Sequence, residues 1–62
     1  MLEGAERFFR AFSNLPVPIR KDIIFVDETN GPITWLVAYV EIKDETELGQ
    51  KILARMSEMK IV

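Results

Sequence analysis

The sequence predicts a small α+β domain of helix–strand–strand–helix order, with one domain over residues 1–62. Apolar residues recur at helical spacing near both ends of the chain. The middle is rich in β-branched and aromatic residues, and Asn30-Gly31 stands between two such runs. We therefore expect helices at about 2–13 and 45–59, and strands at about 20–27 and 33–42.

The first helix is predicted from a single apolar stripe. Its members follow the three- and four-residue spacing of one helix face: Leu2, Ala5, Phe8, Phe9 and Phe12. Glu6 precedes Arg10 by four residues, which is the favourable order for an exposed pair. Pro16 ends the helix, because the residue before a proline avoids the helical region.

The central hairpin is predicted from its turn. Asn and Gly both tolerate the positive φ that a two-residue type I′ turn requires, so Asn30-Gly31 is taken as the turn. In this register Val26 opposes Trp35 and Phe25 opposes Leu36.

The last helix is predicted to begin at Asp44, where Asp44-Glu45-Thr46-Glu47 matches a capping box. Its apolar stripe contains Leu48, Ile52, Met56 and Met59. Gly49 should weaken this helix by about 1 kcal/mol relative to alanine.

The predicted register gives the hairpin two apolar faces. One face is assigned to the two helices and carries Ile23, Phe25, Leu36, Ala38, Val40 and Ile42. The other carries Ile24, Val26, Trp35, Val37 and Tyr39, and two short helices cannot cover both. We therefore expect a second protomer to complete or cover the sheet through these five residues, most simply in a homodimer. The alternative is a monomer with one helix on each face.

The size of the chain also favours self-association. A chain of 62 residues builds a small core, and such domains usually add a disulfide, a metal or a partner chain. There is no cysteine and no histidine, so disulfides and the commonest transition-metal ligands are excluded. The lack of cysteine fits a reducing cytoplasm, where we expect a soluble protein without a membrane span.

Few residues indicate a catalytic, metal-binding or cofactor-binding site. Without histidine or cysteine, acid–base catalysis would need groups such as Tyr39 and Glu41. Asp27 and Glu28 are interpreted as a solvated turn and not as a metal site, and no cofactor motif is present. We therefore expect a non-enzymatic interaction module, with a small-ligand or enzyme site at the dimer interface as an alternative.

A second alternative is an accessory protein that binds nucleic acid through Arg7, Arg10, Arg20 and Lys21. Together with Glu3 and Glu6 they give the first 21 positions a net charge of +2, whereas the whole chain carries −2. An acidic chain is a poor candidate for non-specific binding to nucleic acid.

Overall fold

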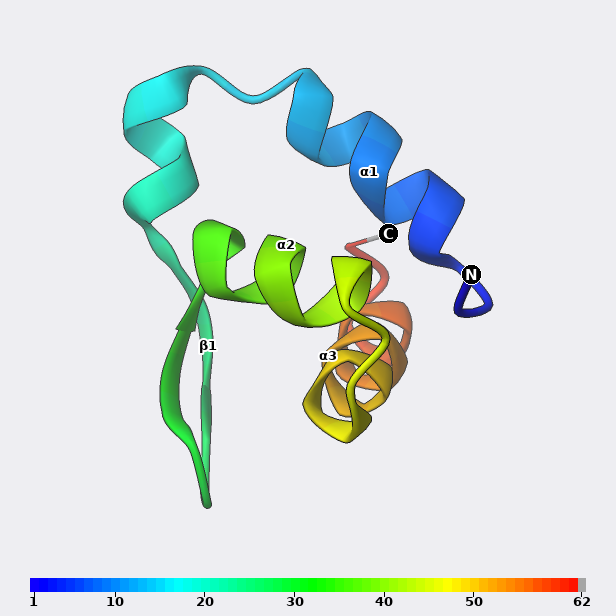
Figure 1. The fold of residues 1–62 in the computed structure, drawn as a ribbon. Helices are drawn as coiled ribbons and strands as arrows, with labels where there is room; N and C mark the ends of the chain where they lie inside the picture. Colours follow the sequence, from blue (N-terminus) through cyan, green and yellow to red (C-terminus); the bar gives the residue numbers. More distant parts are fainter. Residues whose placement is uncertain (62) are drawn as a thin grey trace.

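The computed structural model describes residues 1–61 and confirms an α+β domain with a two-stranded antiparallel hairpin. Over these residues it contains three α-helices and one 3₁₀ helix (Figure 1). In chain order the elements are α1 (Ala5–Ser13), η1 (Val17–Lys21), β1 (Ile23–Asp27), β2 (Gly31–Thr34), α2 (Trp35–Lys43) and α3 (Glu47–Glu58).

The main correction concerns residues 35–42, which were predicted as strand and form helix α2. The helix begins at Thr34, whose Oγ1 accepts a hydrogen bond of 3.1 Å from the backbone N–H of Val37. Periodicity could not separate the two structures, because a run that is apolar on every side fits a buried helix as well as a buried strand. The helix buries Ala38 and Ile42.

The hairpin turn also differs from the prediction. Asp27 pairs with Gly31, so the turn consists of residues 28–30 and not of Asn30-Gly31. The Asp27 carboxylate closes it, because Oδ2 accepts from the backbone N–H groups of Thr29 at 3.1 Å and Asn30 at 2.9 Å. Gly31 adopts a φ of 81°, whereas Asn30 has no positive φ. As a result Val26 lies opposite Pro32, and Trp35 lies outside the sheet.

The two outer helices are shorter than predicted. α1 starts at Ala5 instead of residue 2, and α3 starts at Glu47 instead of residue 45. The cap of α3 is Thr46, whose Oγ1 accepts from the backbone N–H of Gly49 at 3.0 Å. Asp44, the predicted cap, is instead the C-terminal cap of α2.

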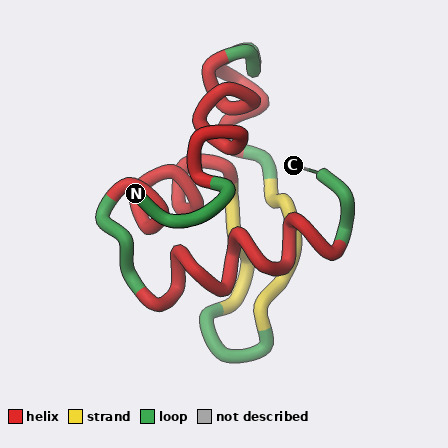
Figure 2. Tube along the Cα trace, turned by 90° about the vertical axis from the view of Figure 1, so that its right-hand side faces the viewer, coloured by secondary structure: helices red, strands yellow, loops and turns green. Residues whose placement is uncertain are grey.

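The core lies between the three helices and β2. Its buried residues are Ala5, Phe8, Phe12, Ile33, Ala38, Ile42, Ile52, Leu53 and Met56. α2 occupies the centre of the fold, since it contacts α1, α3, η1 and β2. Figure 2 shows α3 crossing in front of the two strands, with the turn of the hairpin below it. Among residues 1–61 no helix has the length and apolar character needed to cross a membrane.

Candidate functional site

The side of α2 that faces away from the core is apolar except at its C-terminal end, where Lys43 is exposed. We call Leu36, Val37 and Val40 the outer face of α2; they are 42%, 38% and 50% exposed. Their positions on the helix lie opposite Ala38 and Ile42, which are buried. A helix that is apolar on all sides normally has all sides covered. The outer face of α2 is therefore an exposed surface of mainly apolar side chains.

The hairpin adds a second apolar exposure. Phe25 and Ile33 pair across the sheet, and Ile33 is buried in the core while Phe25 packs against it. The next pair, Val26 and Pro32, lies on the opposite face by strand alternation, and both residues are exposed. Ile23, at the start of β1, is also exposed. The face of the hairpin away from the core is therefore apolar and open.

The five predicted interface residues do not share one sheet face. Ile24 and Val26 lie on β1, whereas Trp35, Val37 and Tyr39 lie on α2. Three of them, Ile24, Trp35 and Tyr39, pack against the core. The ring of Trp35 stacks on Phe8 with centroids 6.0 Å apart, and Tyr39 stacks on Phe12 at 4.6 Å. Val26 and Val37 are exposed.

Sequence reasoning missed Leu36 and Val40, which it assigned to the core face of a strand. The available signal was Thr34 before an apolar run, because threonine is a good N-cap residue.

The four predicted nucleic-acid contacts are spread along α1 and η1. Arg10 pairs with Glu6 at 3.5 Å on the exposed side of α1. The Arg20 guanidinium lies 4.6 Å from the centroid of the Phe12 ring and donates to the Ser13 carbonyl at 3.4 Å. Arg7 lines a hollow beside α3, near the other end of α1, and Lys21 is exposed at the end of η1. Arg7 thus lies in the first half of α1, whereas Arg20 lies in η1 and contacts the C-terminal end of α1.

The carboxylates considered for chemistry have structural partners. Oε1 of Glu41 accepts a hydrogen bond of 2.6 Å from the Thr46 hydroxyl at the junction of α2 and α3. The hydrogen bonds from the Asn30 backbone and side chain, with a smaller one from Thr29, lower the pKa of Asp27 below its ordinary value of 3.8. Over residues 1–61 no cluster of three or more acidic side chains could hold a metal ion.

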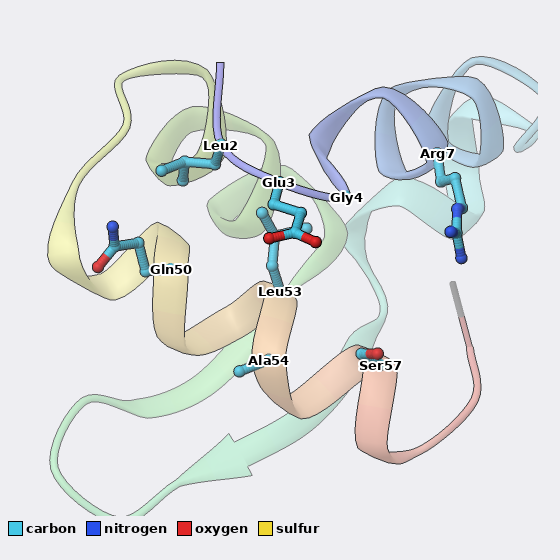
Figure 3. A pocket seen from close by; sticks show the side chains of 8 residues that line it. All are labelled: Leu2, Glu3, Gly4, Arg7, Gln50, Leu53, Ala54 and Ser57. Atoms are coloured by element: carbon cyan, nitrogen blue, oxygen red, sulfur yellow. The ribbon is translucent and has the colours of Figure 1, made fainter.

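A hollow of about 380 Å³ lies between the N-terminal segment, α1 and α3 (Figure 3). Leu53 lies at its base, with the side chain of Glu3 above it and Arg7 towards one end. Most lining residues are exposed, so water reaches both charged groups. An open hollow of this kind lacks the convergent buried polar groups that orient a small ligand.

Comparison with known protein families, curated proteins and solved structures gave no match to this chain.

Proposed function

We propose that the chain is a non-enzymatic interaction module that assembles with a second copy of itself through the outer face of α2. The observation that carries the proposal is that Leu36, Val37 and Val40 are exposed on the most apolar helix of the fold. Contiguous apolar surface on a small protein normally marks a binding site. The absence of histidine and cysteine, and the structural roles of Glu41 and Asp27, favour binding over catalysis.

A second copy is the partner that the size of the chain favours. A domain of 62 residues has a limited core, and oligomerisation is a common way to add buried apolar surface to such a domain. A two-fold axis would place the outer face of α2 against the same face of the partner, as in most homodimers. Folding and assembly would then be linked, so the apparent stability would rise with protein concentration.

The experiment uses a matched pair of variants. Leu36 lies on the outer face of α2 and Met59 caps α3, and the two side chains are equally exposed at 42%. Leu36→Gln should weaken self-association in sedimentation experiments, whereas Met59→Gln should not. Equal effects of the two substitutions, or none, would place the interface elsewhere.

A further inference from the structure

The hairpin turn contains the one Asn-Gly pair of the chain, Asn30-Gly31, and the asparagine is exposed. The side-chain amide of an asparagine can be attacked by the backbone N of the next residue, and asparagine is for this reason a chemically labile residue. Glycine at the next position hinders the attack least, because it has no side chain. We propose that Asn30 is a site of spontaneous deamidation, that Asp27 slows the reaction, and that the product weakens the closure of the turn.

The reaction needs only the turn and the surrounding water. The backbone N of Gly31 forms a bond to Cγ of Asn30, and the bond from Cγ to Nδ2 breaks. Nδ2 leaves as ammonia and takes the proton of the Gly31 N–H. One water molecule then opens the resulting five-membered imide. Opening at one carbonyl gives aspartate, and opening at the other gives isoaspartate, in which the backbone runs through the former side chain.

The Asp27 carboxylate holds the Asn30 amide away from this reaction. Its Oδ2 accepts hydrogen bonds from the backbone N–H of Asn30 at 2.9 Å and from Nδ2 at 3.0 Å. Because one oxygen binds both groups, the side-chain amide is turned towards the backbone N of its own residue. Ring closure requires Cγ to turn the other way, towards the N of Gly31, which is itself the strand partner of Asp27. The bond from Nδ2 to Asp27 must therefore break before the imide can form.

The product changes the surroundings of Asp27. An aspartate or isoaspartate carboxylate replaces the amide, so Asp27 loses a hydrogen-bond donor and gains a negative charge beside it. The charged residues that line the hollow beside the turn are Asp27, Glu28, Lys51 and Arg55. Two carboxylates and two cations balance there, and a third carboxylate leaves an excess of negative charge. Since β2 starts at Gly31 and places Ile33 in the core, a weaker turn also loosens a strand that the core uses.

Peptide mapping by mass spectrometry measures the conversion of each asparagine in the purified chain. Asn14 is the matched control, because it is also exposed but is followed by Leu15. At mildly alkaline pH, Asn30 should convert at least about tenfold faster than Asn14. Equal rates at the two positions, or no conversion of Asn30, would overturn the site.

Asp27→Ala tests the restraint by the carboxylate. The substitution should speed the conversion of Asn30 by about threefold or more in the folded chain, because a hydrogen bond to a charged group is lost. In guanidinium chloride, where the turn is absent, the two chains should convert at the same rate. An Asp27→Ala chain no faster than the wild type when folded, or a difference that persists in the denaturant, would overturn the restraint.

Two substitutions at position 30 test the effect of the product. Asn30→Asp reproduces the aspartate product, whereas Asn30→Ala removes the amide without adding a charge. NMR titration should give Asp27 a higher pKa in Asn30→Asp than in Asn30→Ala, and Asn30→Asp should also unfold at a lower urea concentration. Equal results for the two variants would overturn the effect of the new charge. All of these measurements can be made on the monomer, so they can fail separately from the proposed self-association.

Discussion

Gly49 of α3 lies directly against the backbone of Glu41 in α2. A Cβ built on Gly49 would lie 2.5 Å from the Glu41 carbonyl oxygen and 3.1 Å from the Cα of Ile42. The same junction holds Thr46, which caps α3 and donates its hydroxyl to the Glu41 carboxylate. The absence of a side chain at position 49 therefore allows α3 to approach the backbone of α2 this closely.

The first prediction concerns this contact. Gly49→Ala should lower the free energy of unfolding by about 1–3 kcal/mol, because the clash with backbone atoms outweighs the roughly 1 kcal/mol gained in helix propensity. Urea denaturation measures the change. Gln50→Ala, at the exposed neighbouring position, serves as the control and should alter stability by less than about 0.5 kcal/mol. A Gly49→Ala chain more stable than the wild type would show that α2 and α3 are not this close.

The cap of α2 gives a second prediction. Thr34→Ala removes the acceptor for the Val37 backbone N–H and should cost about 1 kcal/mol of stability. Thr34→Ser keeps the hydroxyl and should cost less than half as much. Thermal unfolding followed by circular dichroism compares the two. Equal losses would mean that the hydroxyl does not cap a helix at this position, as expected if residues 35–42 formed a strand.

Trp35 gives a third prediction because its ring packs on Phe8 in the core. Trp35→Ala should lower the free energy of unfolding by about 2–4 kcal/mol, through lost packing within one chain. Trp35→Phe retains an aromatic ring beside Phe8 and should cost less than about 1.5 kcal/mol. Denaturation at low protein concentration separates this effect from dimerisation. A Trp35→Ala chain of unchanged stability would place the ring outside the core.

The turn gives a prediction about pH. Hydrogen bonds from Asn30 and Thr29 hold the pKa of Asp27 below 3.8, so the folded state favours the ionised carboxylate. This stabilisation is fully present above the unfolded-state pKa and is lost as the pH falls through the lower folded-state pKa. NMR titration of the Asp27 carboxyl carbon should give a midpoint below 3.8. Asp27→Asn should make stability less sensitive to pH in this acidic range, and a midpoint above 3.8 would contradict the hydrogen bonding in the turn.

Local patterns predicted the outer parts of the fold and failed in its centre. The stripe of Ala5, Phe8 and Phe12 was sufficient for α1, because polar residues on the other side fix the orientation of an amphipathic helix. Residues 35–42 lack such contrast, and their β-branched composition favoured a strand. Packing against both α1 and α3 overrides that preference, and only the complete fold brings these helices together.

The residues predicted to form an exposed apolar surface differ from those that are exposed in the structure, for the same reason. An exposed apolar surface was expected, and Val26 and Val37 are exposed. However, the register that grouped them with Trp35 and Tyr39 depended on a two-residue turn. The carboxylate of Asp27 closes a three-residue turn instead and moves the register, while the Thr34 cap begins a helix. Leu36 and Val40 are exposed because residues 35–43 form helix α2. The strand predicted for residues 33–42 placed both side chains on the core face instead.

Self-association is tested most directly by the mass of the purified wild-type chain in solution. Sedimentation equilibrium between about 5 and 200 µM should show a mass that rises with concentration towards at least twice the monomer value of 7.2 kDa. A mass that stays at 7.2 kDa over this whole range would contradict assembly through the outer face of α2.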